Sequence, residues 1–222
     1  MAPPMPDTVR VVGSEVSLSG SAAPGAKVRL ATPDGKAMLA DVSNQGRWTI
    51  ALGEAPGPRI FGLSANVKGR QIQSEGYVLV TPTGQAALLR AGAVTRRIDA
   101  AKGPGIRAID FDRGGGVEIE ALTPPKATVI LRLDGKQVAQ SRADATGRYE
   151  AGLPTLGANA PIGPGQHQIQ VYGDGFADTV SFLISPAAPL AQGPLSSQLT
   201  SAGLRVDWMT PGGGVQSTIL VH

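Results

Sequence analysis

Residues 16–48 read VSLSGSAAPGAKVRLATPDGKAMLADVSNQGRW, and residues 117–149 read VEIEALTPPKATVILRLDGKQVAQSRADATGRY. The second stretch repeats the first in degraded form, with Val16 matched to Val117 and Trp48 to Tyr149. Both matches are 101 positions apart (117 − 16 and 149 − 48). Self-similarity at a fixed spacing indicates a duplicated structural unit. Each unit is too long for a solenoid turn and fits a sandwich domain, so we predict two domains in tandem.

Within each copy, apolar residues alternate with polar ones over short segments. Val28 and Leu30, for example, alternate with basic residues in the first copy. A period of two is typical of half-buried β-strands. Tight-turn sequences separate these segments, namely APG at 23–25, PDG at 33–35 and NQG at 44–46. The pattern predicts a meander of antiparallel strands.

The composition supports an all-β fold. The 222 residues include 30 Gly and 18 Pro, which indicates many turns and short strands, while 4% of the residues are aromatic. The formal net charge is +3. The densest basic group includes Arg96 and Arg97 and is interrupted by acidic residues, so we interpret it as a solvated inter-domain surface in preference to an anion site. Such a group lacks the single sign that phosphate binding needs, and we expect no nucleic-acid partner.

The segment from Ser19 to Leu52 resembles the bacterial immunoglobulin-like domains that occur in tandem in envelope and surface proteins. Their recurring pattern is G-x-A-x-P-G-A-x-V, a D-G turn, and then D-x-x-G-x-[WF]. The second copy departs from the pattern at Lys126, which replaces the turn glycine, and is also similar to carboxypeptidase-regulatory, prealbumin-like repeats. The first copy matches the pattern at Gly20, Ala22, Pro24, Gly25, Ala26, Val28, Asp34, Gly35, Gly46 and Trp48. The resemblance implies a sandwich fold with no catalytic residues.

We therefore predict two tandem immunoglobulin-like β-sandwich domains with an additional C-terminal β-hairpin. The expected order is domain 1 at residues 1–92, a linker or hairpin at 93–112, domain 2 at 113–186, and a C-terminal linker and hairpin at 187–222. The sequence GIRAIDFDRGGGVEIEAL from Gly105 is related to GLRVDWMTPGGGVQSTIL from Gly203, and both are typical of hairpins closed by glycine-rich turns.

Two points of this organisation stay open in the sequence. The C-terminal hairpin either packs back on the linker, which we favour because an isolated hairpin is only marginally stable, or begins a third module. Residues 83–101 fit either a hairpin, which we favour, or a short helix. Helix content is low in both cases.

No residues form a recognisable catalytic, metal or cofactor site. The chain has no Cys, and its two histidines are His167, in an expected strand, and His222, at the end. Two acidic pairs share a strand face, as residues two apart do: Asp110 with Asp112, and Glu118 with Glu120. Such pairs are typical of solvated outer faces. We therefore expect no enzyme activity, no cofactor and no metal.

Four residues are candidate binding residues: Trp208, Phe111, Arg96 and Arg97. Trp208 lies beside a glycine-rich turn, at the position that Phe111 takes in the related hairpin. An exposed Trp would anchor a protein or a sugar, whereas burial of Trp208 against the linker is the alternative that we favour.

These observations indicate a non-catalytic spacer or protein-binding module of the bacterial envelope or cell surface. Its partner would be an envelope or surface protein, captured by strand addition to a sheet edge. The alternative is a carbohydrate- or peptidoglycan-binding module with cell-wall polysaccharide as its ligand. No apolar run is long enough for a transmembrane helix, and the N-terminal MAPPMPD has no leader character. We expect a periplasmic, surface or secreted location, with any leader already removed.

Overall fold

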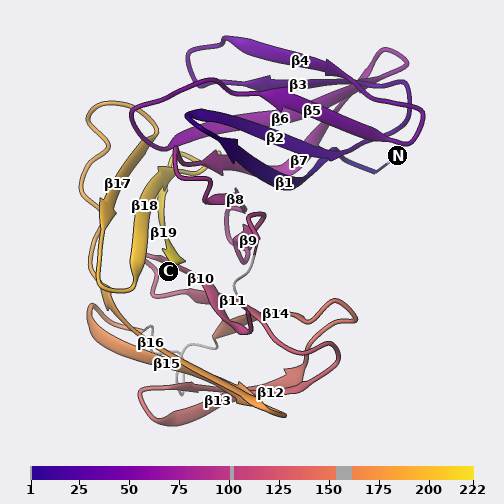
Figure 1. The fold of residues 1–222 in the computed structure, drawn as a ribbon. Helices are drawn as coiled ribbons and strands as arrows, with labels where there is room; N and C mark the ends of the chain where they lie inside the picture. Colours follow the sequence, from indigo (N-terminus) through magenta and orange to yellow (C-terminus); the bar gives the residue numbers. More distant parts are fainter. Residues whose placement is uncertain (1, 101–102, 154–161) are drawn as a thin grey trace. The chain divides into compact units, whose positions relative to one another are not determined.

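The computed structural model describes residues 2–100, 103–153 and 162–222. All regular elements in these ranges are β-strands, which confirms the all-β prediction (Figure 1). The chain divides into two compact units, residues 1–90 with 97–100 and residues 91–96 with 101–222. Each unit contains a β-sandwich, so the predicted tandem sandwiches are confirmed.

The first unit is a sandwich of two antiparallel sheets with strand orders β1-β2-β5 and β4-β3-β6-β7-β8-β9. Strands β1 to β7 have an immunoglobulin-like connection, in which the first, second and fifth strands face the third, fourth, sixth and seventh. The strands are β1 (Met5–Val12), β2 (Glu15–Ser21), β3 (Lys27–Ala31), β4 (Ala37–Asp41), β5 (Arg47–Ala51), β6 (Arg59–Val67), β7 (Arg70–Val80), β8 (Ala86–Leu89) and the two-residue β9 (Arg96–Arg97), of which Arg97 belongs to this unit.

The second unit repeats this plan and extends it. One sheet has the order β13-β12-β15-β16, and the other has the order β14-β11-β10-β19-β18-β17. Strands β10 to β16 reproduce the pairing of β1 to β7, while β17 to β19 enlarge the second sheet beyond β10. The strands are β10 (Gly105–Asp112), β11 (Val117–Leu122), β12 (Thr128–Leu133), β13 (Lys136–Arg142), β14 (Arg148–Leu153), β15 (Gly165–Gly173), β16 (Phe176–Ile184), β17 (Leu195–Leu199), β18 (Gly203–Met209) and β19 (Val215–Val221).

The alternating apolar residues of both copies form the cores between the sheets. Leu18 and Trp48 of one sheet belong to the same buried cluster as Val28 and Leu30 of the other. The equivalent cluster of the second unit contains Tyr149. Trp48 is 2% exposed and Tyr149 is 1% exposed, so the matched aromatic residues lie equally deep.

The two copies adjust a matched pair of positions to fill the same space. In the first copy Gly20 lies opposite Trp48, and a Cβ atom at Gly20 would lie 2.3 Å from the Trp48 ring. In the second copy Ala121 lies opposite Tyr149. The larger ring is therefore paired with glycine and the smaller ring with alanine, as close packing of a core requires.

The turn that follows the second strand of each sandwich is also conserved between the copies. Gly25 has a φ of 73°, and the matched Lys126 has a φ of 61°. Positive φ is unfavourable for a residue with a Cβ atom, so Lys126 holds a glycine conformation. The next residue closes both turns by the same bond, from Ala26 N–H to Ala23 O and from Ala127 N–H to Pro124 O, each 3.1 Å.

The C-terminal hairpin packs back within the second unit. Its strand β19 pairs with β10 in antiparallel register, from Ala108 with Leu220 to Asp112 with Gln216 (Figure 1). Of the segment 83–101, the structure describes residues 83–100, which contain the short strand β8, paired with β7, and the two-residue strand β9. The strand interpretation of this segment is therefore confirmed over the helical one.

Candidate functional site

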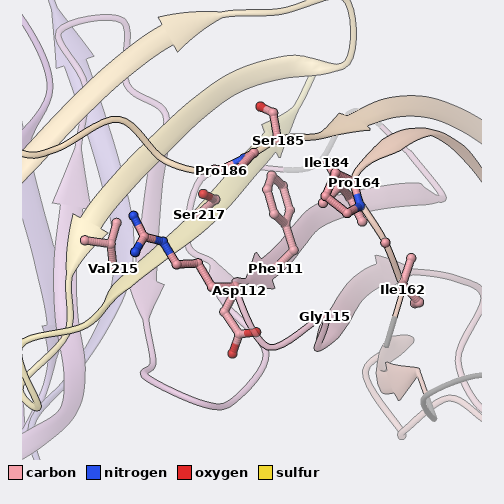
Figure 2. A pocket seen from close by; sticks show the side chains of 12 residues that line it. Phe111, Asp112, Gly115, Ile162, Pro164, Ile184, Ser185, Pro186, Val215 and Ser217 are labelled. Atoms are coloured by element: carbon pink, nitrogen blue, oxygen red, sulfur yellow. The ribbon is translucent and has the colours of Figure 1, made fainter. Parts of the chain in front are cut away.

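Phe111, one of the predicted binding residues, lies in a pocket of the second unit. The pocket has a volume of about 420 Å³ and opens where β10 and β16 end and β19 begins. Figure 2 shows the Phe111 side chain between Ser217 and Ile184. The lining is mostly apolar, from Phe111, Ile162, Pro164, Ile184, Pro186 and Val215, with Asp112, Arg113, Ser185 and Ser217 as the polar members. Such a lining suits an apolar group of a ligand.

A buried arginine packs against Phe111. The Arg205 guanidinium lies 5.2 Å from the centre of the Phe111 ring, a cation–π geometry. Its Nε donates to Asp207 Oδ1 at 2.8 Å, and its Nη2 donates to Ser217 Oγ at 3.1 Å. The Ser217 hydroxyl in turn donates to Asp207 at 2.7 Å. Arg205 is only 3% exposed, so this charge is compensated inside the protein and is a structural group.

Trp208 is fully buried, and burial is the alternative that we favoured from the sequence. Its strand β18 lies between β19 and β17, and its indole Nε1 donates to Thr218 Oγ1 at 3.1 Å. An indole in this position offers no exposed surface to a partner. The binding role of Trp208 and Phe111 stays a prediction, and for both residues it would require access to side chains that are now buried.

Asp110 lies on the same side of the sheet as Trp208 and shares its partner Thr218. Thr218 Oγ1 donates to the Asp110 carboxylate at 2.5 Å, and Thr95 donates to it twice, from its backbone N–H and its hydroxyl. Burial raises the pKa of Asp110 to about 6, although these hydrogen bonds oppose the increase. Asp110 therefore fastens residues 91–96 to the sheet of the second unit.

The prediction that the acidic pairs lie on solvated outer faces is wrong for two of the four residues. Asp110 is buried as described, and Glu120 is buried and forms an ion pair with Arg148. A strand face is solvated only when nothing covers it, and here the apolar pattern alone did not show which faces are covered. Their partners Asp112 and Glu118 are less buried, with Asp112 exposed.

The candidate residues Arg96 and Arg97 differ in exposure. Arg96 is half-buried, whereas Arg97 is buried and its Nε donates to Asp99 Oδ1 at 2.6 Å. The interpretation of this basic group as a solvated surface is therefore wrong for Arg97. A bidentate ion pair of this kind compensates a buried guanidinium. The binding role of both residues stays a prediction.

His167 has a structural role in the second sandwich. Its Nδ1 lies 2.8 Å from Asp134 Oδ2, and its Nε2 lies 2.9 Å from the carbonyl oxygen of Gly163. Burial raises the pKa of Asp134, but the hydrogen bonds from His167 and the Gln168 N–H outweigh burial and hold this pKa below its usual value. Both ring nitrogens of His167 are engaged, so this histidine has no position left for a substrate.

The outer edge of β17 is an exposed feature of the second unit that the sequence did not reveal. Among the described strands it pairs with β18 alone, and Ser196 to Leu199 are exposed. Thr200 and Gly203 exchange backbone hydrogen bonds of 2.8 and 3.3 Å. Since antiparallel pairs alternate, Ser196 and Gln198 also bond inward to β18. The N–H and C=O groups of Leu195, Ser197 and Leu199 therefore point away from the sheet.

The β17 edge also differs in charge from every other edge among the described strands. Four sheets with two ends each have eight edge strands, and seven of these contain at least one Asp, Glu, Lys or Arg. The sequence of β17 is LSSQL, without charge or proline. Charges and proline are the usual protection of an edge against pairing with another chain, and β17 lacks both. A sequence signal existed in this uncharged five-residue run, but only the sheet order identifies it as an edge.

No family model matches this chain, and no curated protein matches it. Among solved structures, the central fibronectin-III array of RIM-binding protein is 14% identical with a TM-score of 0.29, covering 99% of this chain and 88% of that chain. A native alpha-2-macroglobulin structure from Escherichia coli, spanning domains MG0-NIE-MG1, is 11% identical with a TM-score of 0.22, covering 96% and 78%. The fold assignment rests on the strand pairing of this chain itself.

Two further kinds of site concern the described residues, 2–100, 103–153 and 162–222. Among these residues no group of His, Cys, Asp and Glu side chains is arranged to hold a metal ion. Within the same residues, no helix has the length and the hydropathy that crossing a membrane requires.

Proposed function

We propose that this chain is a non-catalytic structural and protein-binding module of the bacterial envelope or cell surface, and that it captures a protein partner by strand addition at β17. The observation that supports the proposal most directly is the free, uncharged β17 edge at the end of a six-stranded sheet. Backbone groups of an added strand would pair with Leu195, Ser197 and Leu199, and main-chain hydrogen bonds supply the affinity in this mode of recognition.

The tandem plan supports a spacer role in the same molecule. Each unit has its own buried core and its own pair of sheets, as is typical of independently folded modules. The ionisable groups that an enzyme would use are engaged in structural contacts instead: His167 with Asp134, Arg205 with Asp207, and Asp110 with Thr95.

Ser197→Pro tests the strand-addition mode. The Ser197 N–H points away from β18, so proline there removes one donor from the free edge and leaves the β17–β18 pairing in place. Gln198→Ala is the matched control, because it changes the neighbouring side chain and leaves every backbone N–H of the strand in place. Immobilised protein is incubated with envelope extract from cells that lack the chain, and retained proteins are measured by mass spectrometry.

We expect a discrete set of proteins to bind the wild type and Gln198→Ala, and their yield to fall at least about tenfold with Ser197→Pro, the equivalent of 1.4 kcal/mol. Equal retention by all three proteins would contradict strand addition at β17.

A parallel incubation with purified insoluble cell-wall polysaccharide tests the alternative ligand, and retention by polysaccharide alone would replace the proposal with that alternative. Fractionation of source cells with an antibody to the chain tests the location, which a cytoplasmic pool would contradict.

A further inference from the structure

The free edge of β17 has a sequence that complements itself. We propose that β17 pairs in antiparallel orientation with β17 of a second copy of this chain, about a two-fold axis at Ser197. The inference rests on the proposed function, because it names one partner for the edge that strand addition uses. Three properties of the described residues lead to it: the direction of the backbone groups, the order of the side chains and the absence of charge.

The backbone groups of β17 fit a symmetric pairing. With Ser197 on the axis, Ser197 meets Ser197 of the second copy, and Leu195 meets Leu199. These are the three residues whose N–H and C=O groups point away from β18. Each facing pair then exchanges two hydrogen bonds, so all of the outward groups of the strand are satisfied. An axis at Ser196 would face Leu195 with Ser197, and an axis at Gln198 would face Ser197 with Leu199, but each of these registers leaves the third outward residue without a partner inside β17.

The side chains at the two ends of β17 also match in this register. Leu199 is 79% exposed, the most exposed large apolar residue of the described chain, and Leu195, four residues earlier, lies on the same face of the strand. Antiparallel pairing sets Leu199 of one copy beside Leu195 of the other, on both sides of the axis. Directly opposed side chains in a sheet lie close enough to contact, so an exposed leucine gains an apolar neighbour.

Charge distinguishes β17 as the edge that can pair with itself. A two-fold axis brings each residue near it close to the same residue of the second chain. A charged residue there would lie near an identical charge, and like charges opposite one another in a sheet are destabilising. The edge strand β13 contains Lys136 and Arg142, and β14 contains Arg148 and Glu150. In contrast, β17 has only Leu, Ser and Gln, and it is preceded by Pro194 and followed by Thr200, which are also neutral.

The contact is short, so the association is weak. Five residues from each copy bury far less surface than the roughly 1,600 Å² of a stable interface. We expect a monomer–dimer equilibrium that depends on protein concentration, which suits a surface module that is held at high local concentration.

Cysteine cross-linking tests the register, and the chain offers a clean background because it contains no Cys. In the proposed pairing the two Ser197 Cα atoms lie about 5.5 Å apart, within the range of a disulfide. The two Ser196 positions lie on a diagonal, beyond the roughly 7 Å at which bridging fails. Under mild oxidation with copper–phenanthroline, Ser197→Cys should form a covalent dimer at least about tenfold faster than Ser196→Cys.

Sedimentation velocity of the full chain over a range of concentrations gives the second measurement. We expect the wild type and Gln198→Ala to dimerise as concentration rises, and Ser197→Pro and Leu199→Lys to stay monomeric at the same concentrations. Leu199→Lys adds a charge without changing the backbone, so it keeps the test valid if the proline variant loses stability in a thermal melt.

The outcomes separate this inference from the proposed function. A wild type that stays monomeric, with equal cross-linking of Ser197→Cys and Ser196→Cys, overturns self-pairing. If Ser197→Pro still abolishes capture of envelope proteins in that case, strand addition to another protein stands. If Ser197→Pro changes neither dimerisation nor capture, both are wrong. A dimer that forms normally with both Ser197→Pro and Leu199→Lys uses a different surface and also overturns the inference.

Discussion

The carboxylate of Asp110 accepts two hydrogen bonds from Thr95, one from the backbone N–H at 2.6 Å and one from the hydroxyl at 2.7 Å. Thr95 belongs to the segment 91–96, and Asp110 belongs to β10 of the same unit. One buried acid therefore joins an irregular segment to a sheet that also contains the C-terminal hairpin.

Asp110 gives the stability of the protein a specific pH dependence. Its pKa is raised from 3.8 to about 6 by burial, so its neutral form stabilises the folded state fully below pH 3.8, and this contribution is lost as pH rises through 6. We expect the unfolding free energy of Asp110→Asn, relative to that of wild type, to increase by about 2 kcal/mol when the pH is raised from 4.5 to 7.5. Urea denaturation at both pH values measures this change. Asp112→Asn, at an exposed position two residues along, is the control, and a difference from wild type that is the same at both pH values would contradict the prediction.

Arg205 and Asp207 are expected to be coupled in stability. Arg205→Met leaves Asp207 without its cation and should cost about 3–5 kcal/mol of unfolding free energy. Replacing both residues, as Arg205→Met with Asp207→Leu, should recover part of this loss because no buried charge remains. Chemical denaturation of the two single variants and the double variant measures the coupling. Strictly additive effects would show that the pair does not act as a unit.

Trp208 should behave as a core residue. Trp208→Ala removes a fully buried ring and should lower the unfolding free energy by about 3–5 kcal/mol. Trp208→Phe keeps most of the apolar volume but loses the hydrogen bond to Thr218, and should cost less. Thermal melts measure both. An unchanged melting temperature together with reduced partner capture would instead support the binding role predicted for an exposed Trp.

Matched turn positions should respond in opposite directions to substitution. Lys126→Gly relieves a left-handed conformation and should stabilise the protein by about 0.5–1 kcal/mol. Gly25→Ala introduces the same strain in the first copy and should destabilise it by about 1 kcal/mol, although a Cβ atom there meets no neighbouring atom. Thermal and urea unfolding give the signs. Two changes of the same sign would show that strain in the backbone is not the cause.

The pairing of Gly20 with Trp48 predicts a rescue experiment. Gly20→Ala places a methyl group where the Trp48 ring and the Met5 carbonyl oxygen lie, and should cost about 1–3 kcal/mol. Adding Trp48→Tyr recreates the Ala121–Tyr149 combination of the second copy and should restore part of the loss. The melting temperature of Trp48→Tyr alone is the necessary control. A double variant no more stable than Gly20→Ala would place the clash at Met5 instead.

Local pattern was sufficient to predict the strands and turns of both sandwiches. The alternation at Val28 and Leu30 and the turn at Pro33 to Gly35 depend on residues that are neighbours in sequence, and short-range geometry determines them. The repeat matched Trp48 to Tyr149, and the two residues are equally buried because matched positions of two copies occupy the same place in one fold. The same pattern did not identify Asp110, Glu120 or Arg97 as buried, since polar residues at alternate positions are also typical of a solvated face.

The sequence by itself determined two antiparallel sandwiches, because the period of two and the glycine- and proline-containing turns are local and were duplicated together. Only the tertiary structure decided that β19 pairs with β10, that Asp110 and Trp208 share Thr218 as a hydrogen-bond partner, and that β17 ends the sheet. These features depend on which strand edges meet across more than a hundred residues of chain. Pairing at that range is selected by the burial of whole faces and the satisfaction of edge hydrogen bonds, which no short stretch of sequence specifies.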